Sequence, residues 1–320
     1  MYRFRWLLVC LIPVFAAGCP RPPGNSQQDK GSTQLGKGNT RQDNPRVMDA
    51  PQNELEGLKR CFKVTDEQVR ESESLDHPYH DLTDVDLKGL RHAKHLRRLH
   101  LSGQQVTDAG LRELKGLTDL EELSLYDTHI TDAGLVEITG LARLTILSLH
   151  RTRVTNAGLK NLNSLRNLTV LILIKTKVTD AGLKELQGLT RLTSLSFDAT
   201  GVTDAGLKDL NGLRNLEKLF LGSTKVTGTG LKDLNGLPKL TWLSLQSAGV
   251  TDAGLKGMEG VPYLRRLDLR NTGVTDAGLE ELRGLTHLEH LDLSLTQVTA
   301  AGVRKLQIAL PNCKIDWQPN

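Results

Sequence analysis

Apolar residues recur along most of this chain with a period of 24 residues. The repeated unit reads Leu-x-x-Leu-x-Leu-x-x-Thr-x-Val-Thr-Asp-Ala-Gly-Leu-x-x-Leu-x-Gly-Leu-x-x. A β-branched residue opens the Val-Thr-Asp-Ala-Gly-Leu phrase in nine successive rows, at Val106, Ile130, Val154, Val178, Val202, Val226, Val250, Val274 and Val298. Leu82 begins the series one row earlier. A fixed period of this length predicts a stacked array of similar structural units.

The first half of each row predicts a short strand. In Arg98-Leu99-His100-Leu101 the leucines alternate with polar residues, so the leucines are expected to face a core and the polar side chains to face solvent. One row cannot bury its leucines alone, but stacked rows share a continuous core. Parallel strands spaced roughly 4.8 Å apart would give ten rows a sheet about 45 Å long.

The second half of each row predicts a brief helix. Either Thr107 or Asp108 is suited to cap the helix at its N-terminus, and Gly116 is suited to end it. The glycine of the Ala-Gly-Leu phrase, Gly110 in this row, is expected to allow close packing between rows. A threonine also recurs after the strand, where its hydroxyl can satisfy the backbone of the turn, at Thr128, Thr152, Thr176, Thr200, Thr224, Thr272 and Thr296.

The repeated unit resembles the leucine-rich repeat family, and its Thr-Asp-Ala-Gly-Leu half is most similar to the subtype shared by F-box-associated and many bacterial repeats. The resemblance covers about residues 75–315. It implies an α/β solenoid, a curved horseshoe with a parallel β-sheet on the concave face and short helices on the convex face. Since end units must cover the open core, we expect an N-terminal cap at residues 53–78, about ten repeats at residues 79–305 and a C-terminal cap at residues 306–320.

The first 18 residues are typical of a secretion signal. A short basic start precedes an apolar run from Trp6 to Phe15, which is too short to span a bilayer. The Ala-Ala-Gly-Cys sequence that ends at Cys19 resembles the lipobox of bacterial lipoproteins, although Ala16 stands where leucine is usual. This resemblance implies cleavage after residue 18 and lipid attachment at Cys19. The alternative is an ordinary secretory signal with an incidental cysteine.

Residues 19–52 predict a disordered tether. They are rich in Pro, Gly, Asn, Gln and Ser, and they contain too few large apolar side chains to bury a core. A flexible segment of this length spans roughly 30 Å, enough to hold a folded body clear of a membrane. In lipoprotein families Pro20 after the cysteine fits the outer membrane better than inner-membrane retention. We therefore expect a lipid-anchored protein of the bacterial cell envelope that faces the periplasm or the exterior.

Composition narrows the classes of function. The chain has 41 Lys and Arg against 37 Asp and Glu, and this near balance argues against a nucleic-acid-binding protein. Aromatic residues make up only 4%, so the core must be aliphatic. The four cysteines are too scattered for a disulfide framework. Cys61 and Cys313 fall in opposite caps, too far apart to form a disulfide with each other, and are expected to be small buried hydrophobic residues.

Candidate catalytic and metal-binding patterns are weak. Asp268 and Asp292 share a column in adjacent rows, at a spacing that retaining glycosidases use, but Arg266 and Arg270 on the same face favour a solvated ion cluster. Histidines gather near the front of the array, without an evident third ligand for either His-x-x-His pair, at His77, His80, His92, His95 and His100. We therefore expect no enzyme, no catalytic residue, no metal and no cofactor.

The resemblance to leucine-rich repeats places recognition on the concave strand face. In the middle rows this face is predicted to expose a patch of mostly apolar side chains, formed by Tyr126, Ile146, His150, Val170, Ile172, Ile174, Phe220 and Trp242. A basic rim suits a partner with acidic edges and consists of Arg151, Arg153, Lys175, Lys177 and Lys225. The alternative is that some of these residues only pack on one another.

These patterns together predict a membrane-anchored module with a monomeric body that binds a partner protein on the concave face. The alternative is a structural or self-associating component of the cell envelope without a dedicated ligand. A third class, an adaptor that recruits an enzyme, would need a recruiting domain before the array. Residues 53–75 are too short for such a domain.

Overall fold

The computed structural model describes residues 50–76 and 82–318. The leader, Cys19 and nearly all of the predicted tether lie outside these residues, as do His77 and His80. No helix within the described residues is long and apolar enough to cross a membrane.

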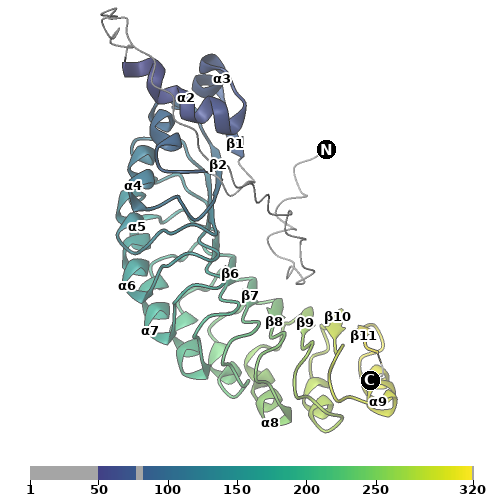
Figure 1. Cartoon of the computed structure of the whole chain (residues 1–320). Helices are drawn as coiled ribbons and strands as arrows, with labels where there is room; N and C mark the ends of the chain where they lie inside the picture. Colours follow the sequence, from purple (N-terminus) through teal and green to yellow (C-terminus); the bar gives the residue numbers. More distant parts are fainter. Residues whose placement is uncertain (1–49, 77–81, 319–320) are drawn as a thin grey trace, which may run out of the picture. The chain divides into compact units, whose positions relative to one another are not determined.

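The described residues form one sheet of eleven parallel strands that follow one another in sequence order (Figure 1). The strands are β1 (Ser74–Asp76), β2 (Arg98–Ser102), β3 (Glu122–Tyr126), β4 (Ile146–Ser148), β5 (Val170–Ile172), β6 (Ser194–Ser196), β7 (Lys218–Phe220), β8 (Trp242–Ser244), β9 (Arg266–Asp268), β10 (His290–Asp292) and β11 (Lys314–Asp316). Leu99 pairs with Leu123 and Leu123 pairs with Leu147. Residues that pair on neighbouring strands are therefore 24 positions apart, which is the period of the sequence. The predicted α/β solenoid is confirmed.

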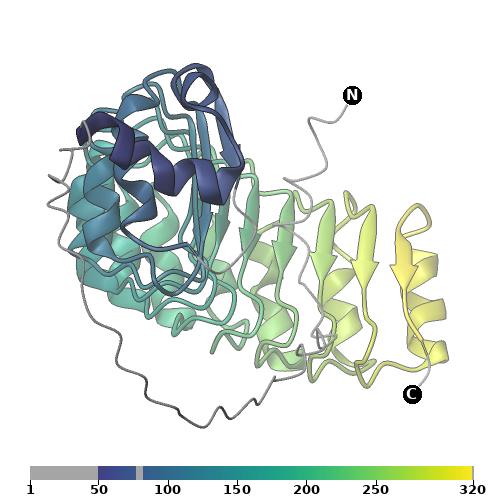
Figure 2. The same ribbon diagram turned by 45° about the horizontal axis from the view of Figure 1, so that its top comes forward.

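Short helices cover the convex side of the sheet (Figure 2). The α-helices between the ends are α4 (Asp108–Leu111), α5 (Gly134–Glu137), α6 (Asn156–Leu159), α7 (Asp180–Leu183) and α8 (Asp252–Leu255). The 3-10 helices are η1 (Asp86–His92), η2 (Arg112–Leu114), η3 (Lys160–Ser164), η4 (Lys184–Leu186), η5 (Asp204–Leu210), η6 (Leu231–Leu234), η7 (Lys256–Gly260) and η8 (Gly278–Leu282). In Figure 1 the helices line the outer side of the curved array and the strands line the inner side.

Aliphatic side chains fill the space between strands and helices. The strand leucines Leu99, Leu123 and Leu147 are fully buried, and the helix leucines of the repeats are buried as well. Phe197 is the largest fully buried side chain. It replaces a leucine in its column, so one wider residue is accommodated without changing the period. The core is continuous from row to row because each leucine contacts its equivalents in the next coil.

The sequence left open whether the threonine or the aspartate of each row caps the helix, and in the structure the two residues have different roles. Thr203 caps η5, since its hydroxyl accepts a hydrogen bond from the backbone N–H of Ala205 at 3.2 Å. Asp180, one row earlier, accepts the backbone N–H of Thr203 at 2.8 Å and its hydroxyl at 2.6 Å. The threonine is thus the helix cap, and the aspartate ties one row to the next. The same aspartate–threonine link recurs at Thr107, Thr131, Thr155, Thr227, Thr275 and Thr299.

The predicted threonine column satisfies the turn backbone. The hydroxyl of Thr128 donates to the carbonyl of Leu125 at 2.8 Å, and the side chain is fully buried. The residue before it, Asp127, has a φ of 53°, a left-handed conformation that the turn requires in each row. The same threonine hydrogen bond is formed by Thr152, Thr176, Thr200, Thr224, Thr272 and Thr296, which confirms the interpretation of this column.

Helices close both ends of the core. At the front, α2 (Ala50–Phe62) and α3 (Asp66–Glu71) precede β1, and α2 begins within the segment predicted as tether. At the back, α9 (Ala300–Ala309) precedes β11. Trp317 follows β11 and donates its indole N–H to the carbonyl of Val298 at 2.9 Å. The final strand is therefore secured to the last full repeat.

Candidate functional site

The strand residues that alternate with the buried leucines lie on the concave face, and each has its equivalent at the same position of the next strand. Ile146 pairs with Val170, and Lys218, Trp242 and Arg266 occupy one column on three adjacent strands. Strand residues alternate between the two faces of a sheet, and the leucines between these positions are buried in the core. The predicted patch therefore lies on one side of the sheet, across strands β3 to β8.

Two members of the predicted patch are not exposed as we expected. Ile172 and Phe220 lie on the concave face, but each is only 5% exposed. The other six are half-buried: Tyr126, Ile146, His150, Val170, Ile174 and Trp242. Side chains of adjacent strands lie about 5 Å apart and cover one another, which explains the difference. The surface available to a partner is smaller than predicted and is divided between an aliphatic centre and two aromatic pairs.

The first aromatic pair joins Tyr126 and His150. Their ring centroids lie 4.9 Å apart with an interplanar angle of 72°. Burial, reinforced by the nearby charges of Lys175 and Arg151, lowers the pKa of His150 to about 4. The imidazole is therefore neutral at physiological pH. Its Nε2 atom is buried without a hydrogen-bond partner among the described residues.

The second aromatic pair joins Phe220 and Trp242. Their centroids lie 5.2 Å apart with an interplanar angle of 66°, an edge-on contact that supports the indole from below the surface. Two cations lie over the same indole. The Lys218 Nζ atom is 5.4 Å from the ring centroid, and the Arg266 Cζ atom is 5.2 Å from it. These distances are within the range of cation–π attraction.

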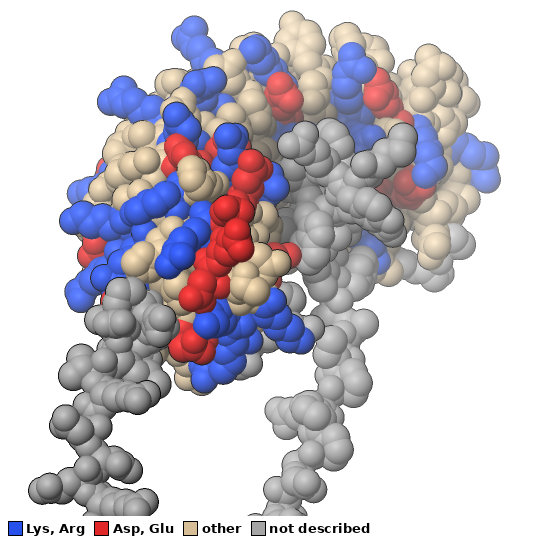
Figure 3. Space-filling model, turned by 90° about the horizontal axis from the view of Figure 1, so that it is seen from above, with Lys and Arg blue, Asp and Glu red and all other residues tan. Residues whose placement is uncertain are grey.

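All five residues of the predicted basic rim are exposed: Arg151, Arg153, Lys175, Lys177 and Lys225. Arg151 contacts the carboxylate of Asp127 at 3.3 Å, and Arg153 donates to His129 at 3.0 Å. Acidic side chains lie among the basic ones elsewhere too. On the face seen in Figure 3, Lys and Arg are interspersed with Asp and Glu, as the near balance of charge predicts.

The acidic residues of the concave face are held by hydrogen bonds. Asp268 accepts the hydroxyl of Ser244 at 3.1 Å and the backbone N–H of Arg270 at 3.0 Å. Asp292 accepts the backbone N–H of Ser294 at 2.8 Å. Burial raises the pKa of Asp268, and the neighbouring charge of Asp292 adds to the shift. Each carboxylate is thus held by hydrogen bonds to its own surroundings, as is typical of structural aspartates on an open sheet.

Two of the histidines at the front, His92 and His100, contact carboxylates. His100 lies between Glu122 and Asp76, at 2.9 Å and 3.8 Å, and His92 contacts Glu54 at 3.1 Å. No group of three metal-ligating side chains is found among the described residues. These contacts link the N-terminal cap to the first repeats.

Cys61 and Cys313 do not form a disulfide with each other. Cys313 is buried, and burial raises the pKa of its thiol to about 11. Cys61 is half-buried and packs against the core. A thiol with a raised pKa is a poor nucleophile at neutral pH, so the packing role is the one supported.

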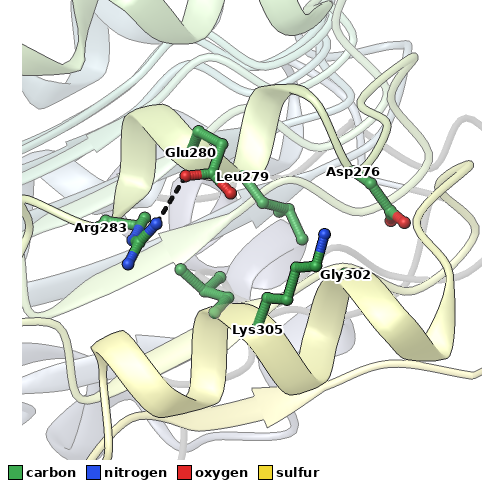
Figure 4. A pocket seen from close by; sticks show the side chains of 7 residues that line it. Asp276, Leu279, Glu280, Arg283, Gly302 and Lys305 are labelled. Carbon is green, nitrogen blue, oxygen red and sulfur yellow. Dashed lines mark hydrogen bonds and ion pairs between the residues drawn. The ribbon is translucent and has the colours of Figure 1, made fainter.

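One depression on the outer side lies between η8 and α9 (Figure 4). It is lined by Asp276, Leu279, Glu280, Arg283, Gly302, Lys305 and Leu306. Arg283 and Glu280 form an ion pair at 2.8 Å within it. The second carboxylate of the lining, Asp276, accepts the backbone N–H and the hydroxyl of Thr299, so both acidic groups of the depression are engaged in structural contacts.

The repeats are recognised by a family model. The model describes a leucine-rich repeat region and matches residues 74–307. The chain belongs to the leucine-rich repeat family. Members of this family typically act as non-enzymatic modules that mediate protein–protein interaction. No curated protein matches the chain significantly.

Solved structures of other leucine-rich repeat proteins share the fold. An internalin C2 from Listeria monocytogenes str. 4b F2365 is 25% identical, with a TM-score of 0.54, over 69% of this chain and 92% of that chain. An internalin, InlF, from the same organism is 20% identical, with a TM-score of 0.48, over 87% and 100%. A TDR receptor is 17% identical, with a TM-score of 0.53, over 78% of this chain and 42% of that chain. This leucine-rich repeat chain spans less than half of the receptor.

Lys218 and Arg266 lie outside the patch and the basic rim that we predicted from the sequence. The missed signal was their position on either side of Trp242 in adjacent rows. Residues 24 apart pair directly in this sheet, so the sequence places both cations beside the indole. What it does not show is that both side chains bend over the ring.

Proposed function

We propose that this protein is a membrane-anchored module that binds a partner protein on the concave face of the repeat array. The partner would contact the half-exposed aliphatic residues Ile146, Val170 and Ile174 and the group around Trp242. The anchor would be a lipid on Cys19, with the body held in the bacterial cell envelope by residues 19–49.

The observation that carries the proposal is the composition of the concave face. Ile146 and Val170 occupy adjacent strands in one column and remain half-exposed on the open sheet. Trp242 stands three strands from Val170, supported by the buried ring of Phe220. Partly exposed aliphatic and aromatic side chains on one face of an open sheet are typical of protein interfaces.

A photo-crosslinking residue tests where the partner binds. We would place it at Val170 in the full chain expressed in its native envelope, and at Val136 on α5 as a matched control. Val136 is 53% exposed on the helix side. Adducts with one defined protein at Val170, and none at Val136, are expected. Equal adducts at both positions, or none at Val170, would contradict concave binding.

A pair of substitutions tests whether the patch itself matters. Trp242→Ala with Val170→Asp is expected to abolish the adduct formed through a crosslinker at Ile174, since it removes the aromatic contact and charges the aliphatic centre. Val136→Asp on the helix side is the control and should leave the adduct intact. An unchanged adduct in the double variant would show that the patch is not the binding surface.

Lipid attachment is tested separately. Labelling with a fatty-acid analogue should modify the full chain and should be lost in Cys19→Ala. Equal labelling of both proteins would refute this anchor. The alternative function, self-association, predicts a mass by light scattering that grows with concentration, and a constant monomer mass would exclude it.

A further inference from the structure

We propose that the concave face recognises an extended acidic segment of its protein partner, with Lys218 and Arg266 binding two carboxylates on either side of Trp242. The inference rests on the proposed function and specifies the chemistry of the partner.

The three residues form a fixed unit. They occupy one column on β7, β8 and β9, and both cationic groups lie within 5.4 Å of the indole centroid. Phe220 is 5% exposed and holds the edge of the indole, so the ring has a rigid support. Long cationic side chains normally lose rotamer freedom when they bind, and holding them over a ring before binding reduces that loss.

The positive charges of Lys218 and Arg266 are available to bind a ligand. Neither side chain takes part in any of the ion pairs found within residues 50–76 and 82–318, whereas the adjacent Arg265 pairs with Glu289 at 2.5 Å. The carboxylate of Asp268, two residues along the same strand as Arg266, is occupied by Ser244 and by the backbone of Arg270. A cation pair without an internal counter-ion attracts an external anion.

Asp198, the other carboxylate toward the middle of this face, is also occupied. It accepts the backbone N–H of Gly222 at 2.6 Å and the hydroxyl of Ser196 at 3.1 Å. Both contacts lie within the sheet, and no ion pair joins Asp198 to Lys218 among the described residues. The carboxylate of Asp198 is therefore held by its own coils and leaves the Lys218 ammonium for an external anion.

The geometry favours a peptide over a sugar. Sugars bind an aromatic ring by stacking on its face, and here cations from the strands on both sides of β8 lie over the indole. The half-exposed aliphatic side chains of Ile146 and Val170 continue the same column and suit the apolar side chains of a peptide.

The spacing defines the acidic motif. Lys218 and Arg266 lie on strands two positions apart, which is roughly 10 Å. Residues two or three apart in an extended peptide are separated by about 7–10 Å. The partner segment would therefore carry two acidic residues two or three positions apart, followed by aliphatic residues that lie toward Val170.

Peptide selection tests this chemistry. The probe is a display library of random short peptides, selected on the immobilised full chain at low and high salt. Wild-type protein is expected to enrich peptides with two Asp or Glu residues at the stated spacing beside aliphatic residues. Lys218→Gln with Arg266→Gln should bind the same peptides about 10- to 100-fold more weakly, since two charge-assisted contacts are lost.

A matched variant controls for net charge. Lys208→Gln with Lys232→Gln removes the same charge from the exposed helix-side positions of η5 and η6 and should leave peptide affinity unchanged. Circular dichroism of each variant confirms that it is folded. A second concave variant, Trp242→Phe, keeps an aromatic ring and should retain most of the affinity, whereas Trp242→Ala should not.

Three outcomes would overturn the inference. The first is equal enrichment of acidic peptides by the wild type and by the variant Lys218→Gln with Arg266→Gln. The second is enrichment of peptides without acidic residues. The third is that no peptide is enriched while sulfated glycans bind the same face. Each of these leaves the crosslinking result at Val170 unaffected, so a failure of the acidic motif is distinguishable from a failure of concave binding.

Discussion

The carboxylate of Asp180 occupies the space that a side chain on Gly206, in the next repeat, would need. A β-carbon built on Gly206 would lie 2.5 Å from the Asp180 Oδ1 atom. Asp180 is held there by the backbone and hydroxyl of Thr203. The recurring glycine is therefore required by the aspartate of the preceding row. An aspartate of the preceding row would cause the same conflict at Gly110, Gly134, Gly158, Gly278 and Gly302, and Asn156 would cause it at Gly182.

Gly206→Ala is expected to lower the free energy of unfolding by about 1–3 kcal/mol, because the added methyl group must displace the Asp180 carboxylate. The matched control is Gly212→Ala in the same repeat. A β-carbon at Gly212 meets its nearest atom at 3.8 Å, an ordinary contact, so little change is expected. Urea denaturation followed by circular dichroism measures both. Equal effects of the two substitutions would contradict the steric explanation.

Restoring the repeat consensus at Gly228 should destabilise the protein. This row has glycine where most other rows have aspartate. Gly228 has a φ of 99°, and its β-carbon position is 2.9 Å from the backbone of Gly254. Gly228→Asp would strain the backbone and clash with the next repeat, at a cost of about 1–3 kcal/mol. A higher denaturation midpoint than wild type would refute this expectation.

Asn156 also departs from the aspartate column, and this position should tolerate the consensus residue. Asn156 accepts the backbone N–H of Thr179 and donates to its hydroxyl, each at 2.8 Å. Asn156→Asp would reverse the hydroxyl hydrogen bond and recreate the arrangement of the other rows. We expect a change in unfolding free energy of less than about 1 kcal/mol. A large loss would show that the amide donor is required.

Asp198→Asn should stabilise the protein at neutral pH. Burial raises the pKa of Asp198 from 3.8 to about 6. The unfolded chain therefore releases its proton at lower pH than the folded protein, and stability is lost as pH rises from about 4 to about 6. Asparagine can still accept the N–H of Gly222 without a charge. Unfolding at pH 7 should show a gain of about 1–2 kcal/mol that disappears below pH 4. A gain independent of pH would contradict this cause.

Two concave histidines should titrate far apart. Burial alone would lower the pKa of His100, but hydrogen bonds and charges from Asp76 and Glu122 outweigh it and raise the pKa to about 9. Burial lowers the pKa of His150 to about 4. Proton NMR near pH 6.5 should therefore show His100 protonated and His150 neutral. In Glu122→Gln the pKa of His100 should fall while that of His150 stays unchanged.

The two shifts have opposite effects on stability. Protonated His100 stabilises the fold fully below pH 6.5, and this contribution is lost as pH rises through about 9. His150 is stabilising when neutral, so its contribution is present above pH 6.5 and is lost as pH falls toward about 4. His150→Phe should flatten the acid side of the stability curve. An unchanged acid side would show that His150 is not buried as described.

The strand phase and the threonine column were both predictable from the sequence. Alternation around Leu99 assigns each side chain to one face of its strand, and the 24-residue period makes Leu123 its neighbour. Thr128 could be assigned to the turn because its hydrogen bond to Leu125 is local. Features that depend only on positions within one row, or on the period itself, follow from the pattern of residues.

Contacts between different side chains of adjacent rows were decided by the tertiary structure. Ile172 and Phe220 were predicted to be exposed, but neighbouring coils cover them. The conflict between Asp180 and Gly206 joins two columns that the sequence shows separately, and its cause appears only when the rows stack. Exposure and charge pairing depend on what the next coil places within a few ångströms, which periodicity alone does not specify. The sequence by itself therefore determines the aliphatic core of this protein, whereas the packing of the coils determines which side chains are exposed to a partner.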